Sequence, residues 1–203
     1  MSAVRPLPIV GGHVALDFAN TVDDPLGPQR WDHIADYEGL LTWAQTVDVV
    51  PAAAVAKLRG RASRQPRRSA GTARRAAELR SVLNETFGAV LDGRSVEAVS
   101  TRLRPYVAEA LAQVTVSVDD REAQLNWEFT EFDSVLWPLA ESAYRLLVGP
   151  ELPRLKRCAG CPWLFLDYSK NRSRRWCSME DCGTHEKIRR YVSKRASTRV
   201  SRR

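Results

Sequence analysis

Residues 158–183 read CAGCPWLFLDYSKNRSRRWCSMEDCG, and this stretch contains all four cysteines of the 203-residue chain. Cys158 and Cys161 form a C-x2-C pair, and Cys177 and Cys182 form a C-x4-C pair after fifteen intervening residues. One chain reversal brings two such pairs together and supplies four thiolates for a tetrahedral zinc ion. The spacing therefore predicts a structural zinc site. Two disulfides or a redox-active C-x2-C are the alternatives; the first needs an oxidising compartment, and the second leaves one pair unused.

The residues around the cysteines indicate how the metal module is built. Residues 162–168 are apolar and aromatic, which is typical of a strand, and residues 169–175 form a polar turn rich in Lys and Arg. Residues 184–195 have a helical pattern in which Ile188 and Val192 are expected to face the metal-centred core. A knuckle, a short hairpin and a helix that starts at the last ligands describe a treble-clef-like zinc finger, in which metal replaces a hydrophobic core.

Positive charge is concentrated in the same part of the chain. Residues 151–203 contain 15 Lys and Arg and 5 Asp and Glu, a net charge of +10. Residues 1–150 contain 16 Lys and Arg and 19 Asp and Glu, a net charge of −3. This asymmetry favours a polyanionic partner. No apolar run approaches the roughly 20 residues of a membrane-spanning helix, and the N-terminus lacks the features of a signal peptide. We therefore expect a soluble, cytoplasmic protein without membrane contact.

The cysteine stretch resembles the CGNR-type zinc finger found at the C-terminus of a family of bacterial transcription regulators. Residues 13–21, HVALDFANT, are similar to the L-D-F-x-N-T motif that opens the family's N-terminal domain, called ABATE, a stress-induced regulatory domain. The resemblance implies zinc binding by four cysteines and DNA binding by the basic finger. The family is named for a Cys-Gly-Asn-Arg sequence. In this chain Cys182 and Gly183 are followed by Thr184 and His185 in place of Asn and Arg, which changes any contact made by that Arg. His185 also permits a Cys3His site with one cysteine free.

The predicted zinc site would hold the basic side chains of the hairpin and the final helix in one rigid module. Ten of them are expected to contact duplex DNA: Lys170, Arg172, Arg174, Arg175, His185, Lys187, Arg189, Arg190, Lys194 and Arg195. Phosphate contacts give affinity, whereas specificity needs side chains that reach base edges in the major groove. Arg190 and Lys194 are candidates for base contacts by their position. Because one finger makes a small interface, we expect a homodimer on a palindromic site.

The first 150 residues show mostly helical periodicity. Helices are expected over 32–46 with Asp32 as the N-cap, from Pro51 to about Gly60, over 73–91, over 95–112 with a kink at Pro105, and over 132–148. Residues 61–72, rich in Ser, Pro, Gly and Arg, predict a break in helical structure. They are either a solvated loop or a flexible arm that contacts phosphates.

One region departs from the helical pattern. Residues 114–118 and 123–130 alternate between apolar and polar positions around Asp119-Asp120, which predicts a β-hairpin. The sequence thus predicts an α+β fold: a mostly helical domain over residues 1–150 with one small antiparallel sheet, followed by a treble-clef-like zinc finger over residues 151–203.

Few residues of the body carry a chemical signal. The sequence has no glycine-rich phosphate loop, no H-E-x-x-H and no serine elbow, so we expect no catalytic residues and no enzyme. Asp17 and Asn20 lie in the L-D-F-x-N-T motif. They either line a small-molecule pocket or brace a chain end while Leu16 and Phe18 enter the core. Four tryptophans of the body are expected in the core: Trp31, Trp43, Trp127 and Trp137.

Taken together, these patterns predict a transcription regulator that needs Zn²⁺ and binds double-stranded DNA through its C-terminal finger. The N-terminal domain would sense a small-molecule effector, form the dimer, or both. An RNA-binding or ribosome-associated zinc protein is the alternative, because basic zinc modules also serve there. An enzyme in which the finger is only a structural element, and an adaptor for other proteins, are further possibilities.

Overall fold

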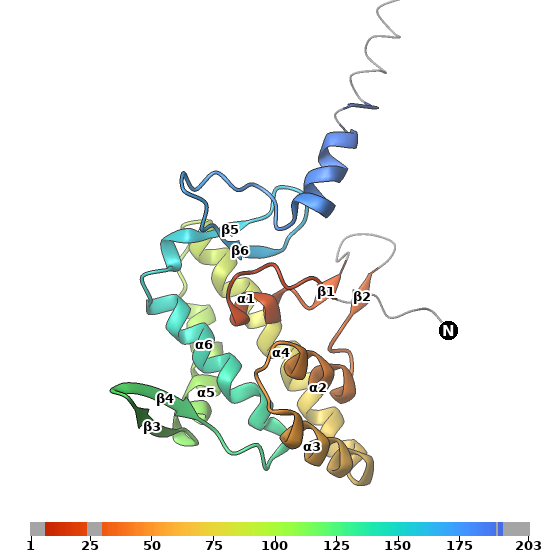
Figure 1. Ribbon diagram of the computed structural model, residues 1–203, viewed down its shortest axis with the longest axis vertical. Helices are drawn as coiled ribbons and strands as arrows, with labels where there is room; N and C mark the ends of the chain where they lie inside the picture. Colours follow the sequence, from red (N-terminus) through yellow and green to blue (C-terminus); the bar gives the residue numbers. More distant parts are fainter. Residues whose placement is uncertain (1–6, 24–29, 190, 193–203) are drawn as a thin grey trace, which may run out of the picture.

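A helical body occupies most of the computed structural model, which describes residues 7–23, 30–189 and 191–192. Three helices form the body (Figure 1): α4 (Pro66–Leu91), α5 (Glu97–Ala112) and α6 (Trp137–Val148). The short helix α1 (Val14–Ala19) packs against both α4 and α6, and its Leu16 and Phe18 are fully buried. The helix predicted over 73–91 is confirmed as part of α4, whose Ala76, Leu79, Leu83 and Phe87 are fully buried.

The remaining elements complete the body at its two ends. Helices α2 (Tyr37–Thr46) and α3 (Ala52–Arg64) pack against α4 at the end far from the cysteines. The 3-10 helix η1 (Phe132–Leu136) leads into α6, and η2 (Leu152–Arg154) follows it. No helix in the described part of the chain combines the length and apolar character needed to cross a bilayer.

Strands occur as three separate antiparallel pairs within the described residues, rather than one small sheet in the body. The pairs are β1 (Val22–Asp23) with β2 (Trp31–Asp32), β3 (Thr115–Asp119) with β4 (Glu122–Asn126), and β5 (Leu155–Arg157) with β6 (Leu164–Leu166). The predicted hairpin is β3–β4. Its turn lies one residue later than expected, at Asp120 and Arg121, whose φ angles of 43° and 70° suit a tight hairpin turn.

Several helix boundaries differ from the prediction. Residues 61–72 are not an irregular break: α3 runs to Arg64 and α4 begins at Pro66, with one non-helical residue, Gln65, between them. Proline has no N–H to donate at an interior helical position but suits the first one, so Pro66 begins a new helix after Gln65. Asp32 is not an N-cap either. Asp36 caps α2 by accepting a hydrogen bond from Gly39 N at 2.8 Å.

Asp32 lies instead in β2 and pairs with Arg80 of α4 through two hydrogen bonds of 2.6 and 2.7 Å. Burial by itself raises the pKa of Asp32, but its contacts with the Arg80 guanidinium outweigh this and leave it below its usual value. This long-range ion pair fixes the β1–β2 pair against the helical body.

The tryptophans of the body follow the prediction only in part. Trp43 and Trp137 are buried, and Trp127 is half-buried with its Nε1 donating to the carbonyl of Ala110. Trp31 is 51% exposed, so its expected core position is wrong. It lies on the two-residue strand β2, where alternation points its side chain away from the core.

The hairpin β5–β6 joins the cysteine region to the body. Leu155, Leu164 and Leu166 belong to the same hydrophobic core as α1, α4 and α6. Strand β5 packs against α4, where Arg157 also forms an ion pair of 3.1 Å with Asp92. The division at residue 150 stays a prediction, but the two parts share one core across it.

Candidate metal centre

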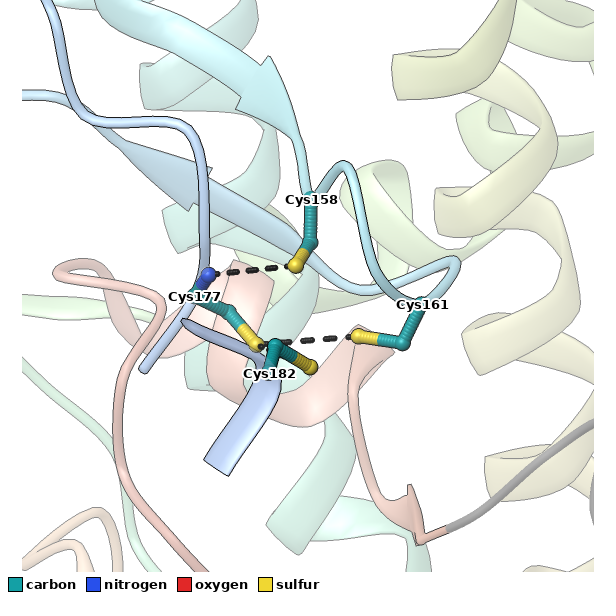
Figure 2. A group of neighbouring side chains, drawn as sticks. All are labelled: Cys158, Cys161, Cys177 and Cys182. Atoms are coloured by element: carbon teal, nitrogen blue, oxygen red, sulfur yellow. Dashed lines mark hydrogen bonds between the residues drawn. The ribbon is translucent and has the colours of Figure 1, made fainter. Parts of the chain in front are cut away.

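Four cysteine sulfurs meet at the end of the β5–β6 hairpin (Figure 2). Cys158 follows β5, Cys161 lies in the turn before β6, and Cys177 and Cys182 come from the returning chain. All four Sγ atoms lie within 4.8 Å of one another, with 3.6 Å between Cys161 and Cys177 and 3.8 Å between Cys177 and Cys182. A tetrahedron with zinc–sulfur bonds of about 2.3 Å requires sulfurs about 3.8 Å apart. The cluster therefore fits Zn²⁺, and His185 is exposed and lies outside it.

Backbone groups support the ligand atoms. The sulfur of Cys158 accepts hydrogen bonds from Cys177 N at 3.2 Å and Gly160 N at 3.4 Å. The neighbouring thiols of Cys161 and Cys177, with these two N–H groups, lower the pKa of the Cys158 thiol, whereas contacts among the sulfurs and burial raise the pKa of the other three thiols. A Cβ at Gly160 would lie 3.1 Å from Cβ of Cys182, so a larger residue there would crowd this ligand.

A small apolar cluster surrounds the cysteines. Trp163 and Phe165 are buried against Cys158 and Cys177, and Trp163 Nε1 donates to the carbonyl of Val22 at 2.8 Å. After Cys177, the turn η3 (Met179–Gly183) carries Cys182, and Ser178 caps it by accepting from Asp181 N. Residues 184–189 then continue as a helix, as predicted.

The apolar face expected on this helix does not pack on the metal. Ile188 is 56% exposed and Val192 is 59% exposed, so their predicted contact with the metal-centred core is wrong. The helix leaves the finger and projects into solvent (Figure 1), and the small core is filled by Trp163 and Phe165 instead.

A buried carboxylate organises the basic turn that follows β6. Asp167 is fully buried and accepts hydrogen bonds from Lys156 Nζ at 2.7 Å, Ser169 N at 2.9 Å and Arg174 N at 2.9 Å. Burial alone raises the pKa of this carboxyl, but the bonds from Lys156 and Ser169 prevail and hold it well below its usual range. Lys156 also donates to the carbonyls of Arg172 and Arg174. The pair therefore fixes both ends of the turn.

The prediction of site residues missed Lys156 and Asp167. A signal was present, because Asp167 is the one acidic residue among the apolar and basic residues between the two cysteine pairs.

Arg174 differs from the other basic residues of the turn. Its guanidinium lies 4.4 Å from the ring centroid of Phe165 and donates to the backbone carbonyls of Val10, Trp176 and Cys177. These contacts tie the turn to the cysteine loop and to the N-terminal segment. Arg174 thus has a structural role, whereas its expected DNA contact stays a prediction.

The other predicted contact residues lie on the surface. Lys170, Arg172 and Arg175 are exposed on the basic turn, and His185, Lys187 and Arg189 are exposed on the following helix. Arg189 forms an ion pair with Glu186 at 2.5 Å, which offsets its charge locally. Three further candidates lie outside the described residues: Arg190, Lys194 and Arg195.

Asp17 and Asn20 connect the body to the finger. The Asn20 side chain donates to Leu164 O at 2.8 Å and accepts from Leu164 N at 2.9 Å, which joins α1 to the edge of β6. Asp17 Oδ1 accepts from the N–H groups of Val10 and Gly11, and Gly11 O in turn accepts from Leu166 N. Both residues therefore brace the chain. Their role in ligand binding stays a prediction.

Comparison with known families agrees with this geometry. The family model ABATE, described as "Putative stress-induced transcription regulator", matches residues 12–150, and the CGNR zinc finger model matches residues 154–195. The first match covers more than half of the chain. A search of curated proteins finds no match to the chain.

Proposed function

Because this chain belongs to the ABATE family and ends in a CGNR zinc finger, we propose that it is a regulator that binds duplex DNA through the finger and requires zinc to do so. The observation that carries the proposal is the position of the basic turn, whose two ends are held by Asp167 and which leads directly into the cysteine ligand Cys177. Zinc supplies the cross-link, and the side chains of the turn supply the charge.

Three cations of the turn suit contact with phosphates. Lys170, Arg172 and Arg175 are exposed on a segment whose backbone is fixed by Lys156 and Asp167. A fixed backbone reduces the entropy lost when these side chains meet a charged surface. Lys187, on the adjoining helix, adds a fourth exposed cation, and an α-helix of this kind fits the major groove.

The salt dependence of the DNA affinity measures how many phosphates the finger contacts. Each neutralised phosphate contributes about −0.9 to the slope of log affinity against log salt concentration. Four exposed cations therefore predict a slope of about −3 to −4, or steeper, on duplex DNA. The experiment is a titration of the zinc-loaded full chain with duplex DNA at several salt concentrations, repeated after chelation.

A pair of matched variants separates the finger from general charge. Changing Lys170 and Arg172 together to Ala should reduce the steepness of the slope by about 2. The matched control changes Arg64 and Arg67 to Ala, which removes the same charge from exposed positions on α3 and α4. A slope near zero, undiminished binding after chelation, or equal effects of both pairs would contradict the proposal. Stronger competition by structured RNA than by duplex DNA would favour the RNA-binding alternative.

We assign signal reception to the N-terminal domain, in which a cavity of about 630 Å³ lies beside α4. Arg75 pairs there with Asp133 and with Glu109, and Trp137 Nε1 donates to Glu109. The opposite end of α4 contacts the finger through Asp92 and Arg157. An effector bound in this cavity would therefore act on a helix that touches the finger, and a shift in DNA affinity on adding the effector tests this role.

A further inference from the structure

The helix that follows the metal centre carries an apolar stripe on its outer side. Its described residues are 184–189 and 191–192, and it projects away from the body (Figure 1). At about 100° per residue, Thr184, Ile188, Tyr191 and Val192 fall within one arc of about 100°. Ile188 is 56% exposed, Tyr191 57% and Val192 59%. Within the described part of the chain, these side chains belong to neither hydrophobic cluster, so the stripe faces solvent.

Charged and basic side chains are arranged around this stripe by sign. Lys187 borders it on one side, and His185 followed by Arg189 borders it on the other. All three are exposed. Glu186 lies on the opposite side of the helix, where its side chain is 15% exposed and pairs with Arg189 at 2.5 Å. The outer surface of the helix therefore combines an apolar centre with basic margins, and the acidic group is turned away from it.

Duplex DNA matches this combination of apolar centre and basic margins. The margins fit the two phosphate backbones that border the major groove, and an α-helix fits between them. On the floor of that groove, the C5-methyl group of thymine is the apolar group that the base pairs present. An apolar protein surface would leave the basic margins without opposite charges. A helix that binds a membrane surface carries Trp, Phe or Leu on its apolar face, and this stripe contains none of them.

We propose that Ile188 and Val192 recognise thymine by packing against its C5-methyl group in the major groove. This inference rests on the DNA binding proposed above and adds the residues that give it a sequence preference. The cations of the basic turn and Lys187 would contact phosphates, which carry no sequence information. A methyl group distinguishes a T·A pair from a C·G pair, so the apolar stripe supplies the information that the phosphate contacts lack.

The size of the effect follows from the methyl group. Burial of one such carbon contributes about fourfold to affinity. Ile188 and Val192 are one helical turn apart, about 6 Å along the axis, so each can cover a separate methyl group. Removal of the methyl groups should therefore weaken binding by about 4- to 16-fold. Because the phosphate contacts remain, the salt dependence of the affinity should not change.

Replacement of thymine by deoxyuridine tests the proposal, since it removes the methyl group and keeps the base pairing. The zinc-loaded full chain first selects its preferred duplexes from random DNA. One selected duplex is then prepared with thymine and with deoxyuridine, and the affinity for each form is measured. The wild type should bind the thymine form about 4- to 16-fold more tightly. In the double variant Ile188→Ala, Val192→Ala this ratio should approach one.

Lys187→Ala is the matched control on the same helix. It removes one phosphate contact, so it should weaken binding to both forms equally, make the salt slope less steep by about 1 and leave the ratio unchanged. Ile188, Val192 and Lys187 are all exposed, so these truncations should leave the fold intact. The zinc content of each variant verifies this.

Two results would overturn the inference and leave the proposed function standing. Either the wild type binds both forms equally while its binding stays steeply dependent on salt, or the double variant retains the wild-type ratio. If the double variant keeps the ratio but loses binding to anionic lipid vesicles or self-association, the stripe serves that partner instead. If the zinc-loaded chain shows no salt-dependent binding to any duplex, the proposed function and this inference fail together.

Discussion

Replacing Asn20 by Ala tests whether the finger is held on the body by one side chain. Asn20 is 2% exposed and satisfies both backbone groups of Leu164, which is itself 2% exposed. Alanine leaves a buried N–H and a buried C=O without their partner.

The expected loss follows from those two groups. Each buried polar group left unsatisfied costs about 1–3 kcal/mol, so we expect the free energy of unfolding to fall by about 2–6 kcal/mol. For a chain of this size, about 1 kcal/mol corresponds to 2–4 °C, which predicts a fall in melting temperature of roughly 4–24 °C. Asn20→Asp should cost at least as much near neutral pH, because a carboxylate oxygen then faces the carbonyl of Leu164. Acidification should partly rescue this variant, since a protonated carboxyl can donate again.

Urea unfolding of the zinc-loaded protein, followed by circular dichroism, measures these differences. The control is Asn171→Ala, at an exposed position in the basic turn, which should stay within about 0.5 kcal/mol of wild type. If Asn20→Ala unfolds with the wild-type midpoint, the bracing role is refuted, and ligand binding becomes the better explanation of the L-D-F-x-N-T motif.

Two further predictions concern the metal and pH. Chelation of zinc should raise the rate of amide hydrogen exchange in residues 174–189. Residues Leu164–Leu166 should stay protected, because Leu164 and Leu166 belong to the main core. An equal loss of protection throughout the chain would contradict this. Burial lowers the pKa of His13, the N-cap of α1, so its contribution to stability is complete above the unfolded value of about 6.5 and is lost as the pH falls below it. His13→Asn keeps a capping acceptor that does not titrate. Between about pH 7.5 and 5.5, the free energy of unfolding of this variant should depend less steeply on pH than that of the wild type, and His33 should account for part of the dependence that remains. If the two proteins show the same pH dependence, His13 is not a source of it.

The features that sequence analysis predicted correctly depend on short-range patterns. Zinc ligands need close cysteine pairs, and the cluster of four thiols agrees with their spacing. The hairpin follows from alternation in residues 115–126, and α4 follows from apolar residues at helical spacing. Local chemistry also predicts the end of α4, where Asp92 and Gly93 stop the helix, Gly93 with a φ of 63°.

The features it missed depend on partners that are distant in sequence. Asp32 has the chemistry of an N-cap, and only Arg80, 48 residues away, explains why it lies in a strand instead. Arg174 looks like its basic neighbours until Phe165 and three carbonyls engage its guanidinium. Ile188 and Val192 have helical spacing, but spacing does not show whether a second surface is present to cover them.

The contacts of the N-terminal segment constrain how the body and the finger can move relative to each other. Hydrogen bonds from Leu164 to Asn20 and from Leu166 to Gly11 satisfy the outer edge of β6, which two strands alone would leave open. Burial of Leu155, Leu164 and Leu166 adds about 1.5–3 kcal/mol for each side chain. Swinging the finger away on a linker would break all of these contacts together, a cost comparable to the stability of a whole domain. Under the function proposed above, regulation by a hinge is therefore disfavoured, and a signal received by the body would act by shifting α1 or α4 against the finger.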